Sequence, residues 1–125
     1  MKNQGVKMRD HKKLEVFHFA DQYVLDVYES TKNFPREETY GLLSQRRRSA
    51  YSVPSNIVEG CGRQTVKEFT QFLSIAFGSL RESLYFVELS GRLGYLSQEA
   101  VKKLLTTGNR CAGALSNMIY KIKTN

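Results

Sequence analysis

The apolar residues of the chain recur at steps of three and four positions, which is the period of an α-helix. Short breaks separate the periodic segments at Asn33-Phe34-Pro35, at Gly60-Cys61-Gly62 and after Leu93. The pattern predicts helices over about residues 13–32, 35–60, 65–93 and 97–122. No useful length of chain alternates apolar and polar residues, so we expect no β-sheet. The predicted fold is an all-α, antiparallel up-down-up-down four-helix bundle in a single domain.

Capping signals mark the starts of three predicted helices. Thr65-Val66-Lys67-Glu68 fits the capping box, in which the threonine oxygen and the glutamate carboxylate each satisfy a free backbone N–H. Ser97 is suited to cap the fourth helix, and Pro35 is suited to the first position of the second. Pro54 lies inside that second helix, where it removes a hydrogen bond and predicts a bend.

The third predicted helix is apolar around most of its circumference. Its polar stripe is narrow and consists of Glu68, Gln71, Ser74, Gly78, Arg81, Glu82, Glu88 and Arg92. A helix that is apolar nearly all round is buried nearly all round. In a bundle of four helices this indicates a second buried surface, so we expect a homo-oligomer. The alternative is a monomer in which the third helix is unusually central.

Composition adds a strong excess of positive charge. The 125 residues contain 19 Lys and Arg against 12 Asp and Glu, which gives a formal charge of +7. The length suits one domain, with residues 1–12 predicted as a basic flexible arm and residues 13–125 as the bundle. Such a charge favours nucleic acid or an acidic protein surface as partner, although it also serves solubility. No apolar run is long enough to span a bilayer and no signal peptide is visible, so we expect a cytoplasmic protein without membrane contact.

The second predicted helix carries three consecutive arginines that diverge around its axis. Arg46 falls on the apolar side, and we expect its head to reach the rim or to meet a carboxylate such as Glu82. Arg47 and Arg48 are expected to share a surface. The opposite side of this helix is built from short hydrogen-bonding side chains, which suit packing against another subunit or contact with phosphate. An ordinary solvated face is the third interpretation.

The run QRRRSAYSVPSNIVEGCGR, residues 45–63, resembles the signature of the bacterial four-helix-bundle proteins encoded in 23S ribosomal RNA intervening sequences. The usual form there is close to Q-I-R-R-A-A-x-S-I-P-S-N-I-A-E-G-x-G-R, and the resemblance covers roughly residues 12–122. Two positions depart from it or vary: Arg46 stands where the family usually has an aliphatic residue, and Cys61 occupies a variable site.

The resemblance implies a homopentameric ring of bundles without known enzymatic activity. The accessory protein of diversity-generating retroelements is similar; it is a basic pentamer that binds nucleic acid and a reverse transcriptase. Candidate nucleic-acid-binding residues are Arg47, Arg48, Arg63, Lys102, Lys103 and the basic arm. Candidate signature or interface residues are Ser52, Pro54, Asn56, Glu59 and Gly60.

The sequence therefore predicts a non-enzymatic, oligomeric nucleic-acid-binding adaptor, for RNA rather than DNA, that acts through charge and shape because no base-reading motif is present. The alternative is a scaffold that recruits an acidic protein partner such as a reverse transcriptase. An enzyme is disfavoured. Glu15 and His18 match one half of a di-iron motif, but the second half is missing. With two histidines and two unpaired cysteines, neither a metal site, a cofactor nor a catalytic triad is expected.

Overall fold

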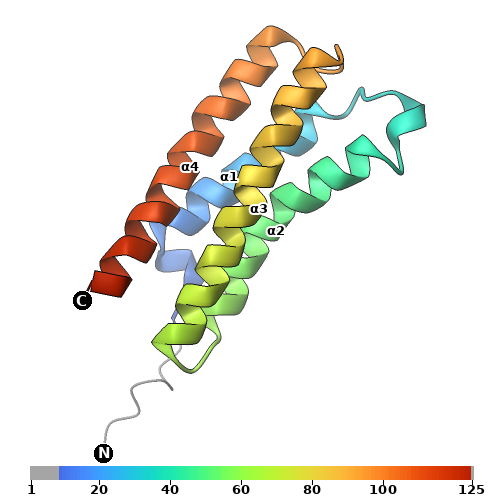
Figure 1. Cartoon of the computed structure of the whole chain (residues 1–125). Helices are drawn as coiled ribbons and strands as arrows, with labels where there is room; N and C mark the ends of the chain where they lie inside the picture. Colours follow the sequence, from blue (N-terminus) through green and yellow to red (C-terminus); the bar gives the residue numbers. More distant parts are fainter. Residues whose placement is uncertain (1–8, 125) are drawn as a thin grey trace, which may run out of the picture.

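The structure, a computed structural model, describes residues 9–124 and contains four α-helices around one core (Figure 1). The helices are α1 (Glu15–Ser30), α2 (Leu42–Cys61), α3 (Val66–Arg92) and α4 (Gln98–Thr124), with 3-10 turns η1 (His11–Lys13) and η2 (Arg36–Glu38). Helices α1 and α3 each pack against both α2 and α4, so they occupy opposite corners of the bundle. Residues 9–124 contain no strand, and the predicted all-α single domain with four helices is confirmed.

The core is a continuous column of apolar side chains that all four helices supply. Its fully buried members include Tyr23, Val27, Val53, Ile57, Leu73, Leu80, Leu104 and Leu115. The Tyr23 hydroxyl lies 2.8 Å from Ser83 Oγ, so a hydrogen bond joins the opposite helices α1 and α3 across this column. Gly108 lets α4 approach closely, because a Cβ there would lie 2.5 Å from Leu84 Cδ2 and 3.0 Å from Tyr23 Cε1.

Two of the predicted helix starts are confirmed at the atomic level. Thr65 Oγ1 accepts a hydrogen bond from the Glu68 N–H at 3.1 Å, and Ser97 Oγ accepts one from the Ala100 N–H at 3.0 Å. The other half of the predicted capping box, from the Thr65 N–H to the Glu68 carboxylate, is not formed. Gly94, the only residue of the described chain with a positive φ (81°), follows the end of α3. The boundaries of α1, α3 and α4 fall within two residues of the predicted ones. Helix α2 continues through Pro54, while the bend there stays a prediction.

The predicted start of the second helix at residue 35 is wrong, because α2 begins at Leu42. Residues 36–38 form η2 instead, and Gly41 has φ −110° and ψ −113°, which are not helical angles. A carboxylate fixes this start from outside the helix. Glu38 Oε1 accepts a hydrogen bond from the Leu42 N–H at 3.0 Å, and its Oε2 accepts one from the Tyr95 hydroxyl at 2.9 Å. The connection is therefore anchored to the segment between α3 and α4.

The predicted flexible arm of residues 1–12 is wrong for residues 9–12, which are ordered on the bundle. Residues 1–8 lie outside the described part of the chain. From Arg9 onward the chain packs against the bundle, since the Arg9 N–H donates to the Cys61 carbonyl at 3.2 Å and His11–Lys13 forms η1.

Burial of α3 is less complete than its sequence indicates. Its inner face is buried, but Val66, Ile75 and Tyr85 remain about half exposed, at 49%, 50% and 51%. These side chains are apolar surface that the described chain leaves uncovered. The predicted second buried surface would have to come from another molecule.

Arg46 lies in the core, and the predictions of a rim position or a Glu82 partner are wrong. Its side chain is fully buried, and none of its three guanidinium nitrogens has a hydrogen-bond acceptor among residues 9–124. The Phe34 ring lies 5.9 Å from the guanidinium carbon, at the edge of cation–π range. Glu82 instead lines a pocket beside Arg48. Burial lowers the pKa of Arg46 to about 10, so the core holds a charge at neutral pH.

Replacing Arg46 with methionine should therefore stabilise the protein. Arg46→Met should raise the free energy of unfolding at pH 7 by about 1–4 kcal/mol, as when other buried ionic groups are replaced by apolar ones. Above pH 10 the Arg46 guanidinium loses its proton in the folded wild type before it does so in the unfolded chain. The wild type is then stabilised, so the difference in unfolding free energy between Arg46→Met and the wild type should narrow. Urea denaturation at pH 7 and at pH 10.5 measures both effects. The exposed control Arg48→Met should change stability by less than about 0.5 kcal/mol; an Arg46→Met protein less stable than wild type contradicts the prediction.

Candidate nucleic-acid interface

The arginines that follow Arg46 reach different neighbours. Arg47 turns toward α1, where its Nε donates to Thr31 Oγ1 at 2.9 Å and its guanidinium lies 4.5 Å from the centroid of the Tyr28 ring. Arg48 is exposed and lines a polar pocket of about 280 Å³ between α2 and α3. The expected common surface of Arg47 and Arg48 is therefore not formed in this structure.

Of the small polar residues of the signature, Ser52 joins α2 to α3, whereas Asn56 bonds back to Ser52 within α2. Ser52 Oγ and Ser79 Oγ lie 2.9 Å apart and share a hydrogen bond between the two helices. Asn56 Nδ2 donates to the Ser52 carbonyl at 2.8 Å and to Ser52 Oγ at 3.0 Å. Since these groups are already paired inside the protein, packing explains Ser52 and Asn56 better than ligand contact does.

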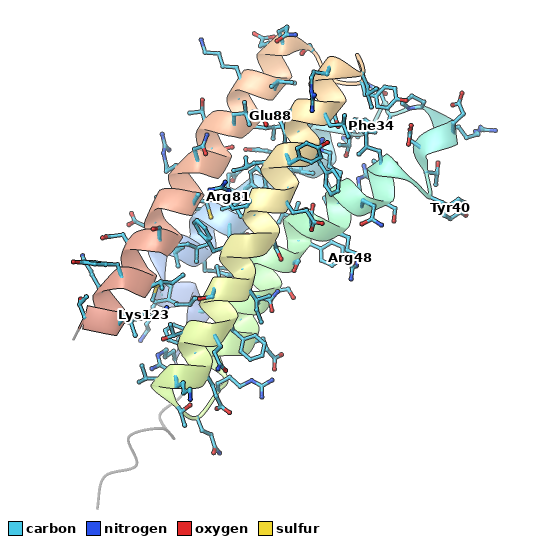
Figure 2. All side chains as sticks on the ribbon, in the orientation of Figure 1. Phe34, Tyr40, Arg48, Arg81, Glu88 and Lys123 are labelled. Carbon is cyan, nitrogen blue, oxygen red and sulfur yellow. The ribbon has the colours of Figure 1, made fainter. Side chains whose placement is uncertain are left out.

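Basic side chains gather at one end of the bundle, where η1, the turn between α2 and α3, and the last turn of α4 lie together (Figure 1). We call this the basic end; its residues are Arg9, Lys12, Lys13, Arg63, Lys67, Lys121 and Lys123. The acidic residues there are Asp10, Glu15, Glu59 and Glu68. Charges at the opposite end are mixed, and Figure 2 shows Glu88 and Lys123 far apart along the bundle.

Arg9 is fixed to the bundle at two points. Its backbone N–H donates to the Cys61 carbonyl at 3.2 Å, which ties the start of the described chain to the last residue of α2. Its guanidinium lies 4.1 Å from the centroid of the Phe69 ring, on the first turn of α3. This distance is well within cation–π range.

Arg63 has a matching arrangement one turn further along α3. Its guanidinium lies 4.6 Å from the centroid of the Phe72 ring, and its Nη2 donates to Glu59 Oε2 across one turn of chain. The Arg63 side chain is 40% exposed. Its Nε is buried without an acceptor among residues 9–124. Glu59, a signature residue, thus positions Arg63.

Gly60 allows the end of α2 to approach the start of α3. A Cβ at this position would lie 3.0 Å from Phe72 Cβ and 3.2 Å from Phe69 Cδ1. Phe72 Cβ is attached directly to the α3 backbone, and Phe69 Cδ1 belongs to a ring that lies under the Arg9 guanidinium. Both atoms therefore have little room to move. The signature glycine therefore sets the contact on which the basic end is built. Pro54, two turns earlier, is buried.

Lys102 and Lys103 are exposed on the first turns of α4, at the end of the bundle opposite Arg63. The five predicted nucleic-acid-binding residues thus fall in separate places rather than in one patch. The sequence prediction also missed contributors. The apolar positions of Phe69 and Phe72 in the sequence indicate core residues, which is confirmed for Phe69, and the sequence does not single out Lys121 or Lys123. The spacing of Phe69 and Phe72 by three residues is the signal that puts both rings on one side of α3.

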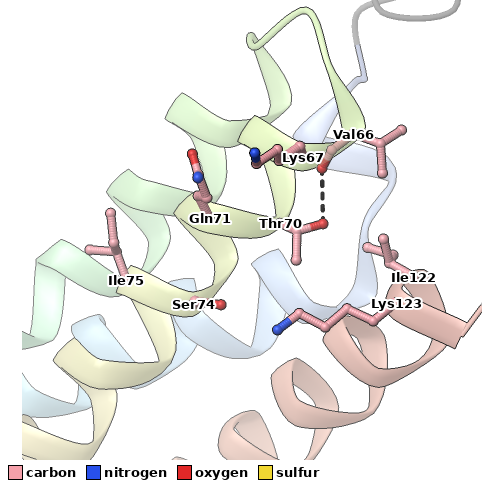
Figure 3. A pocket seen from close by; sticks show the side chains of 8 residues that line it. All are labelled: Val66, Lys67, Thr70, Gln71, Ser74, Ile75, Ile122 and Lys123. Atoms are coloured by element: carbon pink, nitrogen blue, oxygen red, sulfur yellow. Dashed lines mark hydrogen bonds between the residues drawn. The ribbon is translucent and has the colours of Figure 1, made fainter.

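An apolar groove of about 790 Å³ opens between α3 and α4 near the basic end (Figure 3). Val66, Ile75 and Ile122 supply its apolar surface, and Lys67 and Lys123 stand at its walls. Thr70 does not present its hydroxyl to a ligand, because this group donates to the Val66 carbonyl at 2.9 Å.

The two cysteines are buried, and His18 contacts the backbone of η1. Burial raises the pKa of the Cys111 thiol to about 12 and also raises that of Cys61, so neither is a thiolate at neutral pH. His18 Nε2 lies 2.6 Å from the Lys12 carbonyl oxygen. Residues 9–124 bring no three His, Cys, Asp or Glu side chains together as metal ligands. Over the same residues, none of the helices combines the length and the apolar character needed to cross a membrane.

The fold and the site define a small four-helix protein whose main surface feature is a basic end. The chain belongs to the family described as 23S rRNA-intervening sequence protein, whose family model matches residues 12–119. A crystal structure of a protein of unknown function from the S23 ribosomal protein family of Bacteroides thetaiotaomicron is similar in fold, with a TM-score of 0.78 and 23% identity. The match covers 84% of this chain and 95% of that one. No curated protein matches the chain.

If Gly60 sets the α2–α3 contact, adding one methyl group there should be costly. Gly60→Ala should lower the free energy of unfolding by about 1–3 kcal/mol, because the Phe69 and Phe72 side chains must be displaced. Gly62→Ala is the matched control, since its Cβ would meet only the Glu59 carbonyl oxygen, at 3.6 Å, and its φ is −88°. Urea denaturation of both variants checks the prediction, and equal stability of the two would contradict it.

Proposed function

We propose that this protein is a non-enzymatic nucleic-acid-binding adaptor of the cytoplasm that binds RNA through its basic end. The observation that carries the proposal is that η1, the start of α3 and the last turn of α4 lie at one end of the bundle and bring Arg9, Lys12, Lys13, Lys67 and Lys121 there. Clustered basic side chains gain binding free energy by releasing counterions from a phosphate backbone. Binding of this kind follows charge and shape, since no base-reading motif is present.

The choice of RNA over DNA is supported by the family to which the chain belongs, whose description refers to 23S rRNA. This description associates the family with 23S rRNA, but it does not name a ligand of this chain. The basic end itself would attract either polymer through its phosphates.

We further propose that the protein assembles as a homopentameric ring of up-down-up-down bundles. The half-exposed Ile75 and Tyr85 on α3 and the apolar groove between α3 and α4 supply surface that a second subunit would cover. The number five comes from the resemblance of residues 45–63 to the family signature. Five copies would place five basic ends on one particle, which would strengthen binding to a long RNA by multivalency.

A second candidate function is a scaffold for an acidic protein partner, such as a reverse transcriptase. The groove favours it, because apolar Val66 and Ile122 are flanked by Lys67 and Lys123. A pull-down that recovers one stoichiometric protein after nuclease treatment would support the scaffold. Loss of the recovered protein after nuclease treatment would support RNA as the direct ligand.

The proposal predicts salt-dependent RNA binding that is sensitive to charge at the basic end. Fluorescence anisotropy of a labelled single-stranded RNA at several salt concentrations should show log K falling linearly with log salt. Lys12→Gln combined with Lys13→Gln should weaken binding and reduce the slope by about 1.4, since each phosphate contact on a single strand contributes about 0.7.

The matched control is Lys102→Gln combined with Lys103→Gln, which removes the same charge from the opposite end. It should change the RNA affinity and the slope of log K against log salt less than the Lys12→Gln, Lys13→Gln variant does. A larger loss of affinity in this control would place the interface on the first turns of α4 instead. No salt-dependent binding by the wild type would contradict nucleic-acid binding altogether.

A further inference from the structure

We propose that Arg9 and Arg63 are stacking platforms for the unpaired bases of a single-stranded nucleic acid. The inference rests on the proposed function and names the class of ligand: strands whose bases are free to leave a duplex. It assigns Arg9 and Arg63 a role that their positive charge alone does not provide.

The two arginines form a repeated unit on consecutive turns of α3. Each guanidinium covers a phenylalanine ring, at 4.1 Å for Arg9 over Phe69 and at 4.6 Å for Arg63 over Phe72. The rings are three residues apart, and such residues on a helix are neighbours with Cβ atoms about 5–6 Å apart. Two planar groups are thus held side by side, close enough for one strand to reach both.

The contacts that hold Arg63 leave part of its side chain exposed, and Arg9 is half-buried. Arg63 is bound to Glu59 through its Nη2, at the edge of the guanidinium plane, and its inner face rests on Phe72. With 40% of the side chain exposed, solvent reaches the group from outside. Arg9 is also held through its backbone N–H, so the docking of this segment does not depend on the guanidinium alone. A guanidinium plane of this kind stacks on nucleobases.

The charge of Arg63 is largely neutralised by Glu59, so its stacking can be told apart from simple electrostatic attraction. Because Glu59 lies against the guanidinium, the pair contributes little net charge to the surface. Its contribution to binding would then come from its planar face, which lysine lacks. Lys12 and Lys13 are exposed and have no carboxylate partner among residues 9–124, so they suit the phosphates on either side.

The arrangement predicts a preference for single strands without a preference for base sequence. A base inside a duplex cannot offer its face to a protein, whereas every unpaired base can. A single strand should therefore bind more tightly than a duplex of the same length, although the duplex carries the higher charge density. Stacking would also let a protein without a base-reading motif distinguish single-stranded from double-stranded RNA.

The test compares an oligoadenylate with an abasic oligonucleotide of the same length and backbone, using fluorescence anisotropy. Wild-type protein should bind the oligoadenylate at least about tenfold more tightly, which lies within the range measured for stacking of one or two bases. Arg9→Lys combined with Arg63→Lys keeps the charge and removes both planes. This variant should lose most of that advantage, bind the abasic strand as the wild type does, and keep the same salt slope.

Arg92→Lys, at the exposed end of α3 opposite the basic end, is the matched control and should bind both strands as the wild type does. Equal binding of the two strands by the wild type would overturn the inference, and so would full retention of the advantage in the double variant. Both results leave salt-dependent binding in place. Failure of the wild type to bind either strand at low salt would instead overturn the proposed function, and the inference with it.

Discussion

The contact between Gly60 and the phenylalanines at the start of α3 is the constraint on which the proposed site depends. With little room for a Cβ, the last turn of α2 lies directly on Phe69 and Phe72. The turn between α2 and α3 is short, so the Arg63 guanidinium lies over the Phe72 ring. The carbonyl of Cys61, at the end of α2, accepts a hydrogen bond from the Arg9 N–H. One close approach thus sets the positions of both arginines. A bulkier residue would separate the helices at the point where three segments of chain converge.

The buried core stabilises the fold, whereas the basic end carries the exposed charges of the proposed site. The core is a continuous column, and it contains a charged Arg46 whose nitrogens have no acceptor among residues 9–124. The rest of the packing must outweigh this cost, as the close contact of Gly108 with Tyr23 and Leu84 illustrates. At the basic end, by contrast, the arginines rest on ring faces and their charges remain near solvent. In the proposed ring, rotational symmetry would bring all basic ends to one level, where a single RNA could meet several of them.

Helical periodicity predicted the four helices and most of their boundaries, because packing of an apolar stripe is a local pattern. The caps at Thr65 and Ser97 were predictable for the same reason. The start of α2 was not, because Glu38 and Tyr95 fix it through contacts across 57 residues of chain. The candidate site was predicted only in part. Arg63 and the basic N-terminal segment were anticipated, but the pairing of Arg9 and Arg63 with Phe69 and Phe72 depends on tertiary contacts. For Arg46, periodicity gave the correct side of the helix, but it did not show that the core closes over the charge.

The most direct measurement is photochemical cross-linking of the full-length protein to a single-stranded RNA that contains 4-thiouridine, with the linked peptides identified by mass spectrometry. The account predicts that the links fall in residues 9–13, 60–72 and 119–124, the three segments that meet at the basic end. Links concentrated in residues 98–110 of α4, or spread evenly over the surface, would contradict it.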